Sequence, residues 1–363
     1  MARNTIYAAL GEEAERGTKE SQVVGFVPLL SPGIPKTEFD DRRRKEFRGE
    51  EASLGEISVT RFSRKWSAAL EVPFFTETAP SKGLMGTLLK HFFGSCSSGQ
   101  NGATGQYHHM MRPAADPFSD ECLGQKGITL NLNINEGASV RNWPYVGGRV
   151  KSLSFAQEAG HPLKLTAELV GQRREEDTAE LGSPVFAEEN LRCDYNNLAI
   201  YTGPILRTGT APDFTGFSPT GATPLRPDKV TIKMENGFED ALRLSGLDYP
   251  DKTRMGQFMV TAEISIDWED PANGFSSASE FRSWMAGAST TNLLFHWDTG
   301  TQAGTGDNHG LYIDLPKLLR TGGEPQYSLD KDPMVTLRYE GLYDPDTTKY
   351  MAGVMLRNTA QAV

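Results

Sequence analysis

The sequence predicts a mainly β protein built from two tandem modules, each a β-barrel or β-sandwich with one flanking α-helix. Three observations favour this fold class: segments in which apolar and polar residues alternate, one segment of helical periodicity in each half, and many turn-forming residues, with 37 Gly and 21 Pro among 363 residues. This length exceeds the roughly 100–200 residues that are typical of one domain. Each half is long enough to bury a core of its own.

The first half contains several segments with strand periodicity and one with helical periodicity. The helix is expected to run from a Ser81 cap to about Phe93, because Leu84 and Leu88 belong to an apolar face at helical spacing. Residues 95–126 are interpreted as a long loop rich in Gly, Ser and His. The expected strands are Ile57–Arg61, Trp66–Val72, Ile128–Ile134, Arg149–Gln157 and Leu163–Val170.

The second half repeats this order of elements. WSAALEV matches FMVTAEISI, SKGLMGTLLKHFFGS matches SASEFRSWMAGAS, ITLNLNI matches NLLFHWD, and LKLTAELVG matches MVTLRYEGL. The match is one of pattern and spacing, which indicates a duplicated module; the alternative is that any two β-rich segments with one helix look alike. The expected elements are a helix from Ser276 or Ser277 to about Ala286, and strands at Val230–Met234, Phe258–Trp268, Leu293–Trp297, Leu311–Leu315 and Val335–Tyr343.

Composition sets the predicted boundaries between these parts. Proline and a dense mixed-charge run mark the beginning of the chain as an arm without a core, and a Gly, Pro and Thr-rich stretch separates the two halves. The predicted organisation is an extended N-terminal arm at 1–55, a first module at 56–172, a linker or long loop at 173–228, a second module at 229–358 and a tail at 359–363.

Charge and cysteine content limit the class of protein. A net charge of −10 argues against tight binding of nucleic acid through phosphate contacts. The three cysteines, Cys96, Cys122 and Cys193, form no CxxC pair, which is typical of a reducing compartment without a disulfide framework. The first residues have no signal-peptide pattern and no run reaches the ~20 apolar residues of a membrane span. We therefore expect synthesis in a cytoplasm and no membrane insertion by this chain.

Two groups of residues could carry nucleophilic or zinc chemistry. Ser95–Ser98 follows a predicted helix and lacks the G-x-S-x-G spacing of a nucleophile elbow. His108 and His109, with His91 and Cys96, lack the CxxC or HExxH spacing of zinc sites. Both groups are therefore interpreted as structural or loop residues.

Two further patterns could bind calcium or phosphate. The acid pairs Asp330 with Asp332 and Asp344 with Asp346 lack the Gly and distal Glu of a calcium loop. Gly300–Gly310 lacks the Lys-Ser/Thr of a phosphate-binding loop and is interpreted as a hairpin tip. The sequence therefore predicts no catalytic residue, no cofactor and no metal, and hence no enzyme.

Several stretches resemble the tail tube proteins of long-tailed, siphovirus-type bacteriophages, in particular the longer class with a duplicated tube module. They are YAALGEEAERGT, VGFVPLL, WSAALEVPF, GLMGTLLKHFFGS and WPYVGGRVKSLSFAQEAGHPLKLTAELVGQ, and they cover roughly residues 1–172, with weaker support to the C-terminus. The resemblance implies two tandem tail-tube-like modules. It also implies that inner strands of neighbouring modules join into one barrel around a central channel.

The resemblance further implies a structural subunit of the virion tail. Rings of this self-assembling subunit would stack around a channel that holds the tape-measure protein and conducts DNA without sequence-specific binding, and an acidic wall would suit that passage. Tail terminator and tail tip proteins would bind the tube ends. A ring that needs six modules would close with three chains, a homotrimer with pseudo-hexameric symmetry. The candidate assembly or lumen strands are those that contain Trp66, Leu70, Val72, Phe258, Val260, Ile264 and Ile266.

Two alternatives remain open on the sequence alone. A tail terminator or baseplate hub would share the fold and form single rings. A carbohydrate-binding or hydrolytic β protein would need exposed aromatic residues beside paired carboxylates. Glu188, Glu189 and the Asp pairs are the only candidate carboxylates for such a site, and nothing in the sequence brings them together.

Overall fold

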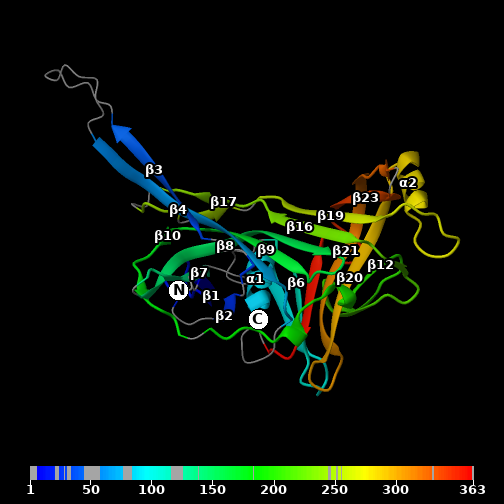
Figure 1. The fold of residues 1–363 in the computed structure, drawn as a ribbon, viewed down its shortest axis with the longest axis horizontal. Coiled ribbons are helices and arrows are strands. Elements are labelled where there is room, and N and C mark those ends of the chain that lie inside the picture. The colour runs from blue at the N-terminus through cyan, green and yellow to red at the C-terminus, as the bar shows by residue number, and fades with distance from the viewer. Residues whose placement is uncertain are drawn as a thin grey trace.

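The computed structural model is mainly β, as the sequence predicts, with two α-helices among many strands (Figure 1). It describes residues 6–20, 24–27, 29–30, 34–44, 58–76, 84–115, 126–137, 139–182, 184–243, 247–250, 252–254, 256–328 and 331–361. The elements are β1 Ile6–Glu12, β2 Gly25–Val27, β3 Lys36–Arg44, β4 Ser58–Pro73, α1 Leu84–Phe93, β5 Gly94–Gln100, β6 Tyr107–Pro113, β7 Ile128–Asn135, β8 Val140–Glu158, β9 Lys164–Gly171, β10 Arg173–Arg174, β11 Thr178–Ala179, η1 Glu189–Leu191, η2 Tyr195–Asn197, β12 Leu198–Thr202, β13 Leu206–Thr210, β14 Asp213–Ser218, β15 Thr223–Leu225, β16 Lys229–Asn236, β17 Glu239–Ala241, β18 Lys252–Arg254, β19 Phe258–Asp267, α2 Ser277–Ala286, β20 Thr290–Gln302, β21 Asn308–Gly322, β22 Pro325–Ser328, β23 Lys331–Gly341 and β24 Gly353–Asn358.

One continuous antiparallel run of strands crosses both halves of the chain. Its order is β3–β4–β9–β8–β16–β19–β23–β22. The halves join where β8 pairs with β16, from Ser152 opposite Glu235 to Glu158 opposite Lys229. Figure 1 shows β3 and β4 extending beyond the body of the molecule at one end of this run.

The larger of two hydrophobic clusters lies against one face of this run. Strand residues alternate between the two faces, so every second side chain of β9, β16 and β19, and of residues 64–73 in β4 and 335–341 in β23, points into it. The core cluster includes Leu70 and Leu169 from the first half and Ile232, Ile264 and Leu337 from the second. The two halves therefore share one buried interior.

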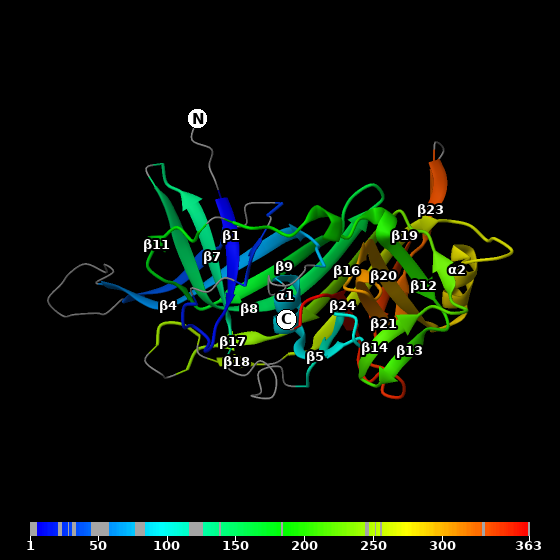
Figure 2. The same cartoon turned by 90° about the horizontal axis from the view of Figure 1, so that it is seen from below.

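Helix α1 closes the core on the side away from the sheet. All its side chains except that of Lys90 are buried, in agreement with the predicted apolar face. Phe92 and Phe93 contact Phe258 of the second half, with ring centroids 5.8 and 6.2 Å apart. Figure 2 shows α1 between β1 and β7 at one end and β20 and β21 at the other. The predicted Ser81 cap lies outside the described residues.

Helix α2 is more exposed than α1. It begins as the sequence predicts, because the Ser279 backbone N–H donates to Ser276 Oγ at 2.9 Å. Phe281 packs edge-on against Trp268 with ring centroids 5.5 Å apart, while Met285 faces outward. This helix therefore covers the second half less completely than α1 covers the first.

The strand order is the same in the two halves. In the first, β3, β4, β9, β8 and β7 are neighbours in that order. In the second, β16, β19, β23, β21 and β20 are neighbours in the same order. The segments that match in sequence, WSAALEV with FMVTAEISI and LKLTAELVG with MVTLRYEGL, thus occupy corresponding strands.

Two β-bulges also recur at corresponding places. β8 shifts its register against β9 by one extra residue, and β21 does the same against β23. The register also shifts between β7 and β8 and between β20 and β21. In both places a step of two residues along the first strand lies opposite a step of three residues along the second. The flanking residues are Val150 and Ser152, Arg320 and Gly322, Ile128 and Leu130, and Thr291 and Leu293. Bulges fix register, so this agreement aligns the halves residue by residue.

A glycine occupies the last position of both β9 and β23. A Cβ on Gly171 would lie 2.2 Å from the Trp66 ring, and a Cβ on Gly341 would lie 2.8 Å from Val260 Cβ. Trp66 is held in place because its indole N–H donates to the Val146 carbonyl at 2.9 Å. Only glycine fits beside these neighbours.

The prediction of an extended arm over residues 1–55 is wrong for β1. This strand pairs with β7 along its whole length, from Ile6 opposite Ile134 to Glu12 opposite Ile128, and Leu10 is fully buried. β3 forms a hairpin with β4, which corresponds better to an arm. The alanine-rich pattern of β1 concealed a strand whose partner lies more than a hundred residues away.

Two predicted loops also contain strands. Residues 95–126 include the β5–β6 hairpin, and β6 pairs with β24 of the second half. Within the predicted linker 173–228, β12 pairs with β20, and Arg207 donates to both carboxylate oxygens of Asp314 at 2.8 Å. Tyr350 also donates to Asp314, at 2.5 Å, so this buried carboxylate fastens the β13–β14 hairpin to β21. The predicted linker is therefore part of the folded second half.

Candidate functional site

The residues predicted for the candidate lumen strands face the core. Six of them are at most 4% exposed, and Phe258 packs against the same cluster. The strands β4 and β19 lie inside the continuous run, but these side chains point away from its open face, because successive residues of a strand alternate. The six buried residues are Trp66, Leu70, Val72, Val260, Ile264 and Ile266.

The open face of the run is formed by the intervening residues. In β4 these are Ser67, Ala69 and Glu71, and in β19 they include Thr261 and Glu263. The same alternation that predicts the strands could have identified them, since the polar member of each pair faces water. This polar face and the two ends of the run form the candidate site.

The open face carries both signs of charge. Lys164 Nζ lies 3.6 Å from a Glu71 carboxylate oxygen across β9 and β4. Arg338 Nε lies 3.3 Å from Glu263 across β23 and β19, and both side chains are more than half exposed. Exposed pairs contribute only about 0–1 kcal/mol each. Their main effect is that acidic and basic groups face one another across strands.

The two ends of the run are unpaired strand edges. Among the described residues, β3 pairs only with β4, and β22 pairs only with β23. Exposed apolar side chains lie at both edges: Ile34 and Phe39 beside β3 are 52% and 47% exposed, and Tyr327 in β22 is 72% exposed. An edge that presents unpaired backbone groups and apolar side chains is a template for another strand.

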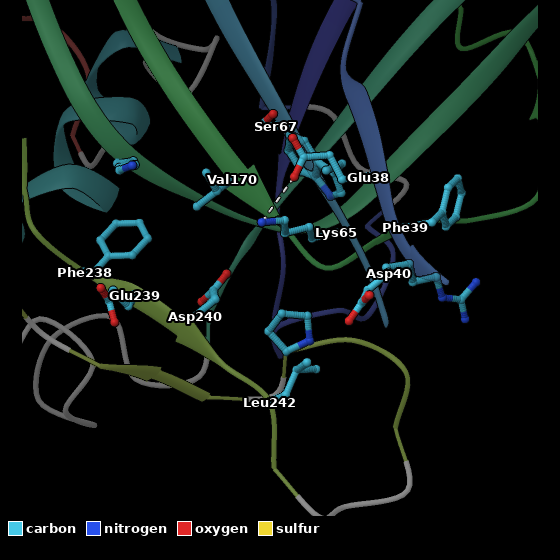
Figure 3. Close-up of a pocket in the computed structure, with 15 residues that line it drawn as sticks. Glu38, Phe39, Asp40, Lys65, Ser67, Val170, Phe238, Glu239, Asp240 and Leu242 are labelled. Carbon is cyan, nitrogen blue, oxygen red and sulfur yellow. Dashed lines mark ion pairs between the residues drawn. The ribbon is translucent and has the colours of Figure 1, made fainter. Parts of the chain in front are cut away.

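An open cavity of about 740 Å³ lies beside the β3 edge (Figure 3). Lys65 and Glu38 point toward one another at its wall, with 3.2 Å between Nζ and Oε2. The opposite wall comes from the segment around β17, where Asp240 accepts from Arg16 at 2.9 Å. Glu38 and Asp240 of this cavity are engaged by basic partners, so we interpret the cavity as a docking surface.

The most strongly perturbed acid near α1 has a packing role. Glu12 accepts from Lys90 Nζ at 3.2 Å and lies 3.3 Å from His91 Nε2. The hydrogen bond with His91 and the neighbouring lysines lower the pKa of Glu12 to about 2, against the opposing effect of burial. Burial lowers the pKa of His91. This group ties β1 to the helix.

Ser95–Ser98, His108 and His109 belong to the paired strands β5 and β6, where the sequence predicted a loop, whereas His91 lies in α1. His109 is fully buried, and its ring nitrogens contact Ser98 Oγ at 2.7 Å and Asn358 Oδ1 at 3.1 Å. Burial raises the pKa of the Cys96 thiol, which disfavours the thiolate. The buried His109 imidazole therefore links β5, β6 and β24, while Ser98 itself is exposed at the β5 end of this contact.

The remaining candidates are turn residues. Asp344 accepts backbone N–H groups from Thr347 and Thr348 at 3.4 and 3.1 Å, as a turn-capping carboxylate does. Asp330 lies outside the described residues. Gly300–Gly310 spans the turn of the β20–β21 hairpin, as predicted. The described part of the chain contains no cluster of three or more His, Cys, Asp or Glu suited to a metal ion.

A family model described as phage tail tube protein matches residues 5–341, which is nearly the whole chain. No curated protein matches the chain. In the part of the chain that the structure describes, no helix is long and apolar enough to cross a membrane.

Proposed function

The chain belongs to the phage tail tube protein family, and we propose that its copies polymerise as stacked rings around a central channel. The observation that carries this proposal is the continuous antiparallel run, whose end strands β3 and β22 each have one edge without a partner strand in the described part of the chain. A sheet with an unpaired edge at each end can accept a strand of another copy at either edge. It can pair head to tail, and head-to-tail contacts that close produce rings.

We infer that the two halves are copies of one tube module. The support is the shared strand order, the two recurrent bulges and the glycine at the end of β9 and β23. A ring that needs six modules then closes with three chains, as a homotrimer with pseudo-hexameric symmetry. In this arrangement the β8–β16 junction inside a chain and the junction between chains alternate around the ring.

The open face of the run is proposed to line the channel, with α1 and α2 on the outer side. Its side chains are polar and of both signs, with pairs such as Lys164–Glu71 and Arg338–Glu263. Among the described residues, this surface has no stripe of basic side chains that would bind DNA phosphates and no large apolar area that would hold a protein tightly. It suits the tape-measure protein before infection and DNA in transit without sequence-specific contacts.

The chain is thus proposed to serve as a non-enzymatic component of the virion tail, made in the host cytoplasm. Tail terminator and tail tip proteins are the partners proposed for the two ends of the tube. They would meet the ring surfaces that are left without a stacking neighbour at each end.

Negative-stain electron microscopy of the purified full-length chain tests this proposal. Over a series of rising protein concentrations we expect hollow tubes of uniform width, because stacking is favoured by mass action. Single rings at every concentration would instead favour a terminator or baseplate hub. Dispersed monomers at every concentration would contradict assembly by this chain alone.

A further inference from the structure

We propose that the junction between two chains reproduces the β8–β16 junction inside one chain. The segment Gly322–Ser328 of one copy would pair antiparallel with the beginning of β3 of the next copy. This inference rests on the proposed ring and adds to it a partner strand and a register. It follows from the residue-by-residue alignment of the two halves.

One side of the proposed junction is the edge of the sheet that contains β22. After its bulge, β8 pairs with β9 from Ser152 opposite Glu168 to Ala156 opposite Lys164. After the equivalent bulge, the segment that contains β22 pairs with β23 from Gly322 opposite Arg338 to Gln326 opposite Met334. Gly322–Gln326 therefore corresponds to Ser152–Ala156. In β8 the other side of this segment pairs with β16, whereas Gly322–Gln326 has no second partner strand among the described residues, although the Arg320 guanidinium donates to the Gly322 and Gly323 carbonyls.

The other side of the proposed junction is the edge formed by β3. Trp66 lies beside Gly171 and pairs with Thr37 of β3. Its counterpart Val260 lies beside Gly341 and pairs with Met234 of β16. Thr37 therefore corresponds to Met234, and the flanking residues agree in sequence.

The flanking residues are a lysine and a glutamate on both strands. Lys36 corresponds to Lys233 and Glu38 to Glu235. Each lysine forms an ion pair with its own glutamate two residues on, Lys36 with Glu38 at 3.3 Å and Lys233 with Glu235. The beginning of β3 is thus built like the strand that already pairs with β8.

The register between chains follows when each residue of the β8–β16 junction is replaced by its counterpart in the other half. Inside the chain Leu153 lies opposite Met234, so Gly323 of one copy would lie opposite Thr37 of the next. This register places Glu324 directly opposite Lys36, and Gly322 opposite Glu38. The junction therefore brings an acid and a base face to face on the polar side of the sheet.

A second charge match appears one row further along. Inside each chain Glu38 pairs with Lys65 at 3.2 Å, and Arg338 pairs with Glu263 at 3.3 Å. Gly322 stands between Glu38 and Arg338 across the proposed junction and has no side chain to separate them. The row Lys65, Glu38, Arg338, Glu263 would then alternate in sign through both chains, which disfavours a shifted register.

Both edges carry a proline, and the register places Pro35 opposite Pro325. Proline cannot donate to a ladder, and it is a common guard on exposed strand edges. The corresponding β8 and β16 segments contain no proline. The junction between chains would therefore have fewer hydrogen bonds than the β8–β16 junction, so that subunits stay separate until they meet the matching edge.

Cysteine crosslinking tests the register in assembled protein. Cβ atoms of directly opposed residues lie about 4.5–5.5 Å apart, whereas diagonal neighbours are about 7–8 Å apart. A disulfide needs roughly 3.5–4.5 Å. The variant Lys36→Cys/Glu324→Cys is therefore expected to form covalent trimers under mild oxidation, at least about fivefold faster than the matched control Lys36→Cys/Gln326→Cys. The two single-cysteine series Lys36→Cys and Glu324→Cys measure the background from native thiols.

The possible outcomes separate the register from the ring. Rings of the unmodified chain together with equal or faster crosslinking of the control pair would overturn the register and leave the ring standing. Absence of rings in the unmodified chain would overturn the proposed function itself. A charge exchange gives an independent check: Lys36→Glu and Glu324→Lys should each weaken assembly about fivefold per junction, and the double exchange should restore it.

Discussion

Deletion of residues 1–13 is expected to abolish cooperative folding of the subunit, even though this segment looks like a terminal arm in the sequence. β1 covers β7 along its whole length, and Ala8, Ala9 and Leu10 are fully buried. The Glu13 carboxylate accepts from the Gly147 backbone N–H and from Thr129, both at 2.8 Å. Its removal would leave both donors unsatisfied at the core, in addition to exposing the apolar face of β7.

Circular dichroism and urea titration measure this effect. The truncated chain is expected to lack a cooperative unfolding transition. The milder variant Leu10→Ala is expected to lower the free energy of unfolding by about 2–5 kcal/mol, as for other large buried side chains. Glu15→Ala, at an exposed position two residues beyond the deletion, is the matched control and should change it by less than ~0.5 kcal/mol. A truncated chain that unfolds at the wild-type urea midpoint would show that β1 is dispensable.

Gly171→Ala is expected to destabilise the fold strongly. The added Cβ would lie 2.2 Å from the Trp66 ring, which is buried and cannot move aside without losing its hydrogen bond to Val146. Overpacking of this kind costs about 1–3 kcal/mol and occasionally more. We expect a loss of about 3 kcal/mol for Gly171→Ala. At the corresponding Gly341, where the nearest atom is Val260 Cβ at 2.8 Å, we expect about 2 kcal/mol.

The matched control for both variants is Gly182→Ala, because no atom lies within 4 Å of a Cβ at that position. Its free energy of unfolding should stay within ~0.5 kcal/mol of the wild-type value. Urea titration of the three variants side by side gives the comparison. A neutral effect at Gly171 or Gly341 would mean that the two strand ends tolerate a side chain, and the structural parallel between them would lose its energetic basis.

Local periodicity was sufficient to predict the long elements of the fold. The alternation in Trp66–Val72 and Phe258–Trp268 predicted β4 and β19, and Ser276 predicted the beginning of α2. These elements owe their form to residues within a few positions of one another.

Elements defined by distant partners were not predictable in this way. β1 is a strand because β7 lies beside it, and β12 is a strand because of β20. β5 and β6 contain Gly, Ser and His in place of a clear alternation, and β24 pairs with β6. For β1, β12 and β6 these partners lie more than eighty residues away, beyond the reach of periodicity.

The candidate functional site was likewise predictable only in part. The sequence located strands β4 and β19, but the large apolar residues that mark them, such as Trp66 and Ile264, face the core. The open face and the free edges depend on which strands are neighbours in the sheet. Residues such as Lys36 and Glu324 have no distinctive local pattern, and only the strand order brings them to the ends of one run.

The mass of a single ring tests most directly the claim that one chain contributes two modules. Native mass spectrometry of rings released from tubes by mild salt, combined with rotational averaging of end-on electron micrographs, supplies that mass and the symmetry. Three chains of 39.9 kDa give a ring of about 120 kDa with three-fold symmetry and a six-fold outline, which is the result that we predict. A ring of six chains, about 240 kDa with true six-fold symmetry, would contradict it.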